Sequence, residues 1–326
     1  MRVLVTGGAG YIGSHTAKAL AQAGHEPIVL DNFSSGHRWA VKWGPLAEGE
    51  LADSKLVHTT LKEERIEAVL HFAASIAVGE SVKEPQKYFW NNVVNTLRLL
   101  DAMLDAGVKQ IVFSSSAAVY GNPQQVPTPE EHLTHCVNPY GDTKLMMERA
   151  LHWYGRAYDL GWIALRYFNA AGADSEGELG EAHNPETHLI PLVMQAALGR
   201  RPCIEVYGTD YPTPDGTAIR DYIHVADLAD AHVRALNYIA AGGASQAINL
   251  GTGRGHSVRE VINAVGRISE RPVPVHEAPR RAGDAPILVA GADRAGRLLG
   301  WKPIRSELET IVQSAWKWHA EGRRGD

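Results

Sequence analysis

The segment RVLVTGGAGYIG, residues 2–13, decides the fold of this chain. Its first five residues are mostly apolar and β-branched, which predicts a buried strand, and glycines at 7, 10 and 13 predict a tight turn into a helix. The unpaired N–H groups at the start of such a helix can hold a pyrophosphate, because glycine lets a ligand approach the backbone closely. The segment therefore predicts the first strand, turn and helix of a dinucleotide-binding domain.

Short apolar runs alternate with helical patterns through the first half of the sequence. The runs are apolar throughout and do not alternate with polar residues, which is typical of parallel strands buried on both faces. We therefore expect an α/β fold with a doubly wound parallel sheet of the Rossmann type. The expected strands are 2–6, 27–31, 68–73, 110–114 and 162–167, and the expected helices are 12–23, 86–106 and 139–158.

A second, smaller region is expected after a stretch rich in Gly, Glu and Pro at 172–185. Its pattern is of the α+β type, with helices at 188–198 and 225–240 and strands at 204–207 and 247–250. We divide the chain into a dinucleotide-binding domain, 1–172, and a C-terminal lobe, 173–326. Within that lobe, residues 222–255 are expected to pack back on the first domain.

Composition and charge restrict the class of protein. The 326 residues carry a net charge of −5 with Lys and Arg scattered along the chain, which argues against nucleic acid as a partner. Cys136 and Cys203 are the only cysteines; they cannot form a disulfide framework and lack metal-ligand spacing, so we expect no metal. No signal peptide or apolar run of membrane length is visible, which predicts a cytoplasmic protein without a membrane partner.

Asp31 indicates which dinucleotide binds. It follows the second apolar strand, about eighteen residues after the glycine turn. A carboxylate at this position accepts a hydrogen bond from a ribose 2′-OH and repels a 2′-phosphate, which favours NAD over NADP. The alternative is a cap or turn residue.

Tyr140, Lys144 and Ser116 form a candidate proton-transfer site. Asn138 can cap a helix that begins at Pro139, so Tyr140 and Lys144 are expected at i and i+4 on one helical face. A neighbouring cation favours the phenolate, which would make Tyr140 a base near neutral pH, and Ser116 could steer the same proton. Taken alone, the spacing is also common on solvated helix faces.

A series of ordered motifs resembles the UDP-glucose 4-epimerases of the extended short-chain dehydrogenase/reductase family, and the resemblance covers nearly the whole chain. The glycine turn has the GxxGxxG spacing of that family. The motifs are TGGAGYIGSH (6–15), LDN (30–32), HFAA (71–74), VGESV (78–82), NNV (91–93), SSSAAVYG (114–121), PYGDTKLMME (139–148), RYFNAAGA (166–173), GTDYPTPDGTAIRDYIHVADLADAH (208–232), NLGTG (249–253) and APRRAGD (278–284).

The resemblance implies NAD as cofactor, a UDP-sugar bound mainly by the C-terminal lobe, and a homodimer formed by helices beginning near Gln86 and Pro139. The apolar faces of those helices could also be wholly intramolecular. Implied cofactor-binding residues are Gly7, Gly10, Tyr11, Ile12, Gly13, Asp31, Asn32, Ser34, Ser35, Gly36, Glu50, Leu51, Phe72, Ala73, Ala74, Ile76, Asn92, Ser116, Tyr140, Lys144 and Phe168. Implied substrate-binding residues are Ser116, Tyr140, Asn169, His188, Leu189, Tyr207, Arg220, Arg281, Asp284 and Leu288.

The resemblance also implies a mechanism. Tyr140 takes the proton of the sugar 4′-OH while the C4 hydride passes to NAD⁺, which leaves a 4-keto sugar. This sugar rotates about its link to UDP and receives the hydride on its other face. Lys144 is expected to lower the pKa of the phenol and to contact the nicotinamide ribose. For Asn92, a cofactor contact and a structural role are equally good expectations.

Four positions depart from the family pattern. Ile76 stands where many members have a lysine near the cofactor phosphates, which weakens the expectation of tight NAD retention. Glu50 replaces an aspartate near adenine, and His188 replaces an asparagine near the uracil or sugar. Leu288 is intermediate between a bulky residue that excludes N-acetylated sugars and a small one that admits them, so we expect UDP-glucose and UDP-galactose as the main pair.

Several other functions stay open at this point. UDP-N-acetylglucosamine, UDP-glucuronate or UDP-pentose 4-epimerisation would use the same core chemistry. A dehydratase is disfavoured, because Ala117 and Ala118 follow Ser116 where an acid would be needed. A plain dehydrogenase and a non-catalytic NAD-sensing module remain as further alternatives, the latter disfavoured because Tyr140, Lys144 and Ser116 are all present.

Overall fold

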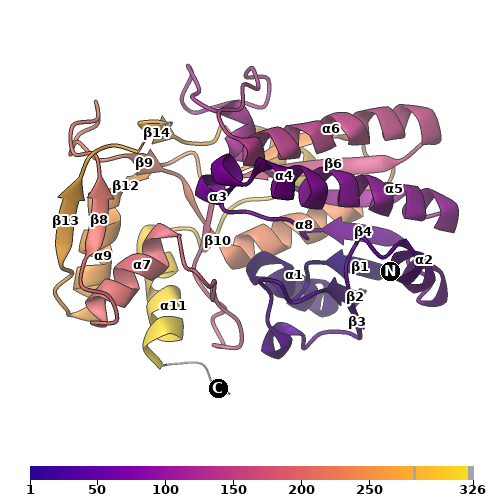
Figure 1. Cartoon of the computed structure of the whole chain (residues 1–326), viewed down its shortest axis with the longest axis horizontal. Helices are drawn as coiled ribbons and strands as arrows, with labels where there is room; N and C mark the ends of the chain where they lie inside the picture. Colours follow the sequence, from indigo (N-terminus) through magenta and orange to yellow (C-terminus); the bar gives the residue numbers. More distant parts are fainter. Residues whose placement is uncertain (282–283, 322–326) are drawn as a thin grey trace.

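The computed structural model describes residues 1–281 and 284–321 of the chain. Its centre is a seven-stranded sheet in the order β11-β6-β5-β4-β1-β2-β3, in which all neighbouring strands run parallel (Figure 1). This confirms the expected doubly wound α/β sheet. The strands are β1 (Arg2–Thr6), β2 (Glu26–Asp31), β3 (Leu46–Glu48), β4 (Ala68–His71), β5 (Gln110–Ser116), β6 (Gly161–Tyr167) and β11 (Gln246–Leu250).

Helices cover both faces of the sheet, because successive strand residues point to opposite sides. Val3 and Val5 of β1 pack into one core, whereas Leu4 packs into the other. Against the first face lie α1 (Tyr11–Gln22), α8 (Val225–Ala240) and α10 (Asp293–Leu299). Against the second lie α2 (Ser54–Glu63), α5 (Asn95–Ala106) and α6 (Pro139–Tyr158).

A second lobe lies beside this sheet and has its own apolar core, which includes Val193, Val206, Val261 and Ile311 (Figure 1). Its helices are α7 (Leu189–Ala197), α9 (Val258–Ser269) and α11 (Leu308–Glu321). Its short strands are β8 (Ile204–Tyr207) with β13 (Val275–Ala278), and β9 (Ile219–Arg220) between β12 (His256–Ser257) and β14 (Ile287–Leu288). The strands β7 (Asn169–Ala171) and β10 (Tyr222–His224) pair with each other.

The chain returns from the second lobe to the first. After β10, α8 packs along α1, and β11 pairs with β6 at the end of the large sheet. The boundary between the two parts is therefore crossed more than once by the chain. Within the described residues, no helix combines the length and the apolar character needed to cross a membrane.

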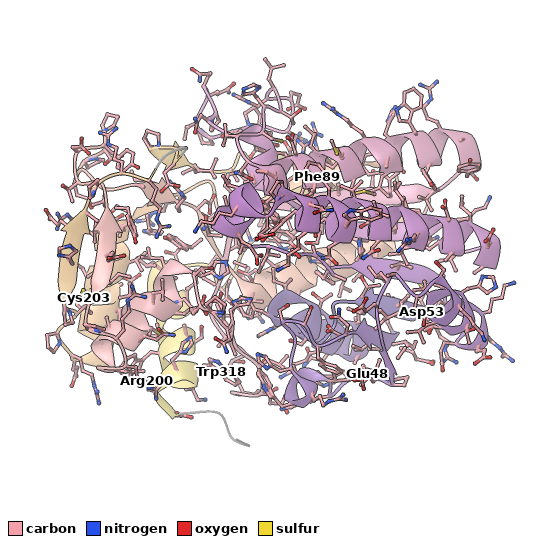
Figure 2. The ribbon with its side chains drawn as sticks, viewed as in Figure 1. Glu48, Asp53, Phe89, Arg200, Cys203 and Trp318 are labelled. Atoms are coloured by element: carbon pink, nitrogen blue, oxygen red, sulfur yellow. The ribbon has the colours of Figure 1, made fainter. Side chains whose placement is uncertain are left out.

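Several elements differ from the expectation or were not foreseen. The helix expected at 86–106 is α4 (Pro85–Tyr88), a π-helical turn η2 (Phe89–Val94) and α5 in succession. The unforeseen α2 is capped by Asp53, labelled in Figure 2, whose Oδ1 accepts the N–H of Leu56 at 3.0 Å. Further unforeseen elements are α3 (Val78–Lys83), η1 (Arg38–Ala40), η3 (Ala117–Tyr120), β3, α9, α10, α11 and the short strands of the second lobe other than β8.

His71 links three elements at the carboxyl end of β4. Thr96 donates its hydroxyl hydrogen to the carbonyl of Asn92 (2.7 Å), so it accepts from Nε2 of His71 (2.8 Å). Nδ1 of His71 then accepts from the hydroxyl of Thr6 on β1 (2.6 Å). This arrangement fits a neutral imidazole, and burial together with the charge of Lys144 lowers the pKa of His71 to about 3.

Replacing His71 with Asn should reduce the acid sensitivity of the fold. Because the folded-state pKa lies below that of the unfolded chain, the unfolded state binds the extra proton first, and stability falls as the pH drops below about 6.5. The wild type should therefore lose about 2 kcal/mol more than His71→Asn between pH 7 and pH 4.5. Urea unfolding at both pH values measures this difference. His276→Asn, which changes an exposed histidine of β13, should keep the wild-type loss; an unchanged loss in His71→Asn would contradict the assignment.

Candidate active site

Tyr140 and Lys144 lie in the first two turns of α6, as predicted. Asn138 caps this helix, its Oδ1 accepting the N–H of Gly141 at 2.8 Å, and Pro139 is the first helical residue. Lys144 is 3% exposed; its Nζ donates to the carbonyl of Ser114 (2.7 Å) and lies 5.8 Å from the centroid of the Tyr140 ring. The structure thus brings the helix pair to the carboxyl end of β5, where Ser116 lies.

The electrostatics of this pair differ from the expectation. Burial raises the pKa of Tyr140, and a hydrogen bond with Ser116 acts in the opposite direction. Burial also lowers the pKa of Lys144 to about 7. In the protein alone the pKa of Tyr140 is therefore raised overall, because removal from water disfavours the charged form of the phenol, and the expected lowering by Lys144 does not prevail.

A buried ion pair holds α6 against the sheet. Arg166 of β6 contacts both carboxylate oxygens of Glu148, with Nε to Oε1 at 2.8 Å and Nη2 bonded to Oε2. Ser115 of β5 donates to Oε1 of the same glutamate (2.5 Å). Arg166 also donates to the hydroxyl of Tyr120, which donates to Asn249 of β11 (2.7 Å). Glu148 and Arg166 both lie in the quoted motifs, but their spacing in the sequence does not predict this network.

The glycine turn is tightly folded between β1 and β4. Gly7 has a φ of +70°, and a Cβ on it would lie 2.7 Å from the backbone nitrogen of Ala73, so a larger residue is excluded there. A Cβ on Gly13 would lie 2.2 Å from the carbonyl oxygen of Gly7. No described side chain caps α1, whose Ncap is Gly10, and its first turn has no acidic residue. Its first N–H groups are therefore suited to an anion such as a pyrophosphate.

Asp31 lies at the end of β2, beside this turn. Its Oδ2 accepts the N–H of Ala9 (2.9 Å) and its Oδ1 accepts the N–H of Phe33 (2.8 Å). The alternative role, that of a turn residue, is therefore present. A carboxylate has about four acceptor positions, so a ribose hydroxyl can still be accepted as well. Burial raises the pKa of Asp31, and the backbone hydrogen bonds act against this.

The other predicted cofactor residues form two groups. Those close to the glycine turn are Gly36, whose Cβ would lie 2.9 Å from Ala9, and Phe72 and Ala73, which follow β4. Tyr11 donates to the carbonyl of Gly172 (2.6 Å). Among the remaining members, Ile12 and Ala74 are partly buried and Leu51 is a buried core residue. The exposed ones are Asn32, Ser34, Ser35, Glu50 and Ile76.

Asn92 has a structural role that the sequence left open. Its Oδ1 accepts from the N–H of Ser75 (2.8 Å) and from Asn91 (3.2 Å). Its Nδ2 donates to the carbonyl of Ser75 (3.0 Å) and to the hydroxyl of Thr143 (3.1 Å). These four bonds use the donors and two of the acceptor positions of the amide, so Asn92 ties the loop after β4 to α6, and a direct cofactor contact is disfavoured.

Several predicted substrate residues meet at the junction of the two lobes. Leu288 of β14 pairs with Arg220 of β9, and its side chain packs with Phe168 against η3, directly after Ser116. Arg220 donates to the carbonyls of Ile219 and Ala285, and its Nη2 lies 4.0 Å from Asp284. Arg281 stacks on Tyr207, with Cζ 3.8 Å from the ring centroid. Asn169 begins β7, and Ala282 and Gly283 of the motif 278–284 lie outside the described residues.

His188 and Leu189 lie at the start of α7. Nδ1 of His188 is 2.7 Å from Oε1 of Glu181 and 3.3 Å from Oε1 of Glu186. Burial disfavours the charged imidazole, but the two carboxylates outweigh it and raise the pKa of His188 to about 10. The predicted substrate residue thus faces two carboxylates, which the sequence analysis did not consider.

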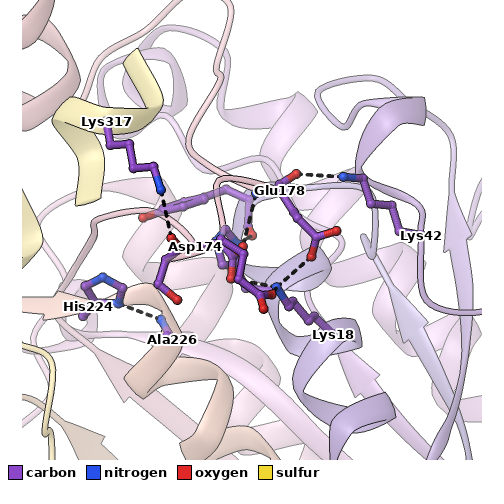
Figure 3. Close-up of polar contacts among 11 residues, drawn as sticks. Lys18, Lys42, Asp174, Glu178, His224, Ala226 and Lys317 are labelled. Atoms are coloured by element: carbon purple, nitrogen blue, oxygen red, sulfur yellow. Dashed lines mark hydrogen bonds and ion pairs between the residues drawn. The ribbon is translucent and has the colours of Figure 1, made fainter. Parts of the chain in front are cut away.

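The loop before α7 is also attached to α1. Nζ of Lys18 donates to Asp174 (2.9 Å), to Glu178 (2.8 Å) and to Glu176 (Figure 3). Lys42 donates to the carbonyl of Glu178 at 3.2 Å. These bonds join the loop at 174–178 to the helix that follows the glycine turn.

Replacing Asn92 with Ala should destabilise the fold. It would leave both backbone groups of Ser75 without their partner and remove the donor to the hydroxyl of Thr143, at a cost of about 2 kcal/mol. Urea unfolding measures this change. Asn91→Ala removes weaker contacts and should cost less than half as much. A stable Asn92→Ala protein that has lost only its affinity for NAD would contradict the structural role.

Comparison with known proteins shows the family of this chain. Residues 3–251 match the model of the NAD dependent epimerase/dehydratase family. The UDP-glucose 4-epimerase of Rhizobium leguminosarum bv. trifolii is 53% identical over 322 residues, covering 99% of this chain and 98% of the relative. The crystal structure of UDP-glucose 4-epimerase from Brucella ovis in complex with NAD has a TM-score of 0.95 and 52% identity, with 97% of each chain covered.

A third comparison is with a structure that holds two ligands. UDP-glucose 4-epimerase from Bifidobacterium longum in complex with NAD+ and UDP has a TM-score of 0.94 and 39% identity, with 100% of each chain covered. The resemblance that the motifs indicated is therefore confirmed over the whole chain. From its sequence and its fold, this chain belongs to the NAD dependent epimerase/dehydratase family.

Proposed function

We propose that this chain is a UDP-glucose 4-epimerase that interconverts UDP-galactose and UDP-glucose and uses NAD. The observation that carries the proposal is the position of Tyr140 and Lys144 beside the carboxyl end of β5, with Ser116 hydrogen-bonded to the phenol. Relatives that are about half identical over their full length, and that carry this name, support it.

The glycine turn fits NAD. Side chains are excluded at Gly7 and Gly13, α1 has no capping side chain among the described residues, and Asp31 favours an unphosphorylated ribose. When bound, NAD⁺ accepts a hydride from sugar C4 and returns the same hydride, so the reaction has no net redox change.

Tyr140 takes the proton of the sugar 4′-OH and returns it after the sugar ring has rotated to present its other face. Ser116 hydrogen-bonds the phenol and aligns the reacting oxygen. Lys144 in its protonated form favours loss of the phenol proton by Coulomb attraction. Its pKa of about 7 means that both protonation states are populated near neutral pH.

The alanines after Ser116 support epimerisation over elimination. Ala117 and Ala118 begin η3, and neither can act as an acid or base at C5 or C6 of a sugar. A 4,6-dehydratase needs a further acid at this place. The proton that Tyr140 accepts is therefore the one it gives back.

The UDP-sugar is bound between the two lobes. Arg220 and Arg281 pair with the diphosphate, because guanidinium groups bind phosphate oxygens in a fork geometry. Asn169, His188, Leu189, Tyr207, Asp284 and Leu288 complete the substrate pocket. In this division, residues 1–172 bind NAD and 173–326 mainly bind the UDP-sugar, with 222–255 returning to the NAD-binding part.

A homodimer and a cytoplasmic location belong to the same proposal. Large apolar side chains are exposed on the neighbouring elements α3, η2 and α6, among them Val82, Trp90, Met146 and Trp153. A second copy of this chain would cover such a face.

Tyr140→Phe should remove most of the turnover and leave NAD binding intact. The loss should be at least about 100-fold, since the variant lacks its acid/base. The assay supplies UDP-galactose without added cofactor and follows UDP-glucose and NADH absorbance together. Tyr154→Phe, on the same helix and bonded to Asp101, is the matched control and should keep its rate. Steady production of NADH when NAD⁺ is supplied would contradict the proposed function.

Leu288→Ala should shift the preference of the enzyme toward N-acetylated UDP-sugars. A smaller side chain beside Phe168 enlarges the pocket, and the ratio of kcat/KM for UDP-N-acetylgalactosamine to that for UDP-galactose should rise about 10-fold. Ile287→Ala changes the opposite face of β14 and should leave the ratio unchanged. Equal turnover of both sugar pairs by the wild type would contradict the expected ranking.

A further inference from the structure

The segment between β7 and α7 carries two glutamates and two histidines in the pattern Glu-x-His-x-x-Glu-x-His. They are Glu181, His183, Glu186 and His188. One ligand atom from each, a ring nitrogen or a carboxylate oxygen, lies within 4.8 Å of all the others. The four side chains therefore converge on one point, although they come from a loop with little regular structure.

The distances fit a tetrahedral ion. Nδ1 of His183 is 3.2 Å from Oε1 of Glu181 and 3.7 Å from Oε2 of Glu186. Nδ1 of His188 is 2.7 Å from Oε1 of Glu181 and 3.3 Å from Oε1 of Glu186. Two ligands on a tetrahedral ion with bonds of about 2.0 to 2.1 Å are about 3.3 Å apart. The observed nitrogen–oxygen separations range from 2.7 to 3.7 Å and so span this value, with Glu186 presenting Oε2 to His183 and Oε1 to His188.

The orientation of the rings is a second, independent observation. Nδ1 of both histidines is buried from solvent, and among the described residues neither has a hydrogen-bond partner of correct direction. The nearby carboxylate oxygens are within hydrogen-bonding distance, so the requirement that is not met is the direction of the N–H bond. The carboxylates are themselves buried, with side chains 4% exposed for Glu181 and 6% for Glu186.

We propose that Glu181, His183, Glu186 and His188 bind a zinc ion in a closed, structural site. Two carboxylates and one divalent cation sum to zero charge when both imidazoles are neutral. Two nitrogens and two oxygens in tetrahedral arrangement suit Zn²⁺, whereas Mg²⁺ and Ca²⁺ prefer oxygen ligands alone. All four positions come from the protein, which is typical of structural zinc sites and differs from catalytic ones. The cysteine spacing of the sequence could not predict such a site.

The acidic cluster on the same loop shows the contrast. Asp174, Glu176 and Glu178 also converge, but the ammonium group of Lys18 occupies their centre (Figure 3). That cluster already has its cation. The cluster at 181–188 has no lysine or arginine within the described contacts, and its two cationic candidates are the imidazoles themselves.

The ion would fix the loop between the glycine turn and the second lobe. The ring of Tyr11, in that turn, meets the ring of His183 edge to face at 6.2 Å. Trp318 of α11, labelled in Figure 2, donates to the carbonyl of Glu181 at 3.1 Å. His188 is the Ncap of α7. One ion would therefore connect the start of α7 with the NAD-binding part, a role that goes beyond the proposed reaction.

Metal content after zinc loading tests the proposal. Protein purified without a polyhistidine tag is incubated with Zn²⁺, passed through gel filtration and analysed by mass spectrometry of the metal. The wild type should keep about one zinc per chain, and His183→Asn and Glu186→Gln should each keep less than about a tenth of that. Zinc should raise the Tm of the wild type by about 5 °C over protein treated with EDTA. Circular dichroism establishes that the variants are folded.

Matched controls separate this site from adventitious binding. Glu178→Gln changes a carboxylate of the Lys18 cluster and His276→Asn changes an exposed histidine, and both should keep the wild-type zinc content. Co²⁺ in the wild type should show the intense visible absorption of tetrahedral nitrogen and oxygen ligation. A wild type that keeps no zinc, or controls that lose as much as His183→Asn, would overturn the site. Tyr140→Phe should keep its zinc, so failure of the proposed reaction and failure of the metal site are distinguishable.

Discussion

The buried pair of Arg166 and Glu148 is the interaction on which the arrangement of the active site depends. It joins β6 to α6, and Ser115 adds β5 to the same carboxylate. Charged groups are rarely buried unless they are paired, and a pair with both carboxylate oxygens engaged has one geometry. The helix that carries Tyr140 and Lys144 is thereby fixed in rotation and height against the strand that carries Ser116.

The second constraint is the close approach of the glycine turn to the end of β4. The backbone atoms of Gly7 and Ala73 leave no space for a side chain, and His71 and Asn92 hold the end of β4 and the loop after it through hydrogen bonds to β1, α5 and α6. Both halves of the candidate site, the turn that fits a dinucleotide and the pair that we propose moves a proton, therefore meet at the carboxyl ends of the parallel strands. This is where ligands bind in open α/β sheets.

The fold and the central residues were predictable because they follow from local patterns. Uniformly apolar runs predicted the five strands 2–6, 27–31, 68–73, 110–114 and 162–167, and the cap at Asn138 predicted the start of α6. Short elements such as β3 have too few residues to show a periodic pattern of apolar side chains. Asn92 was left undecided since its partners Ser75 and Thr143 are distant in sequence, and the pKa shifts of Tyr140 and Lys144 follow from burial, which no spacing reveals.

The sequence by itself determined the parallel sheet, the glycine turn and the helix position of the candidate proton-transfer residues, because periodicity, caps and glycine spacing act over a few residues. Only the tertiary structure decided which of these residues meet and how they are charged. Hydrogen-bond partners and burial depend on segments far apart in the chain, as with Arg166 and Glu148, or Tyr11 and His183. The Glu-x-His-x-x-Glu-x-His segment is the clearest case: its spacing is readable, but the convergence of its ring nitrogens and carboxylates exists only in the folded loop.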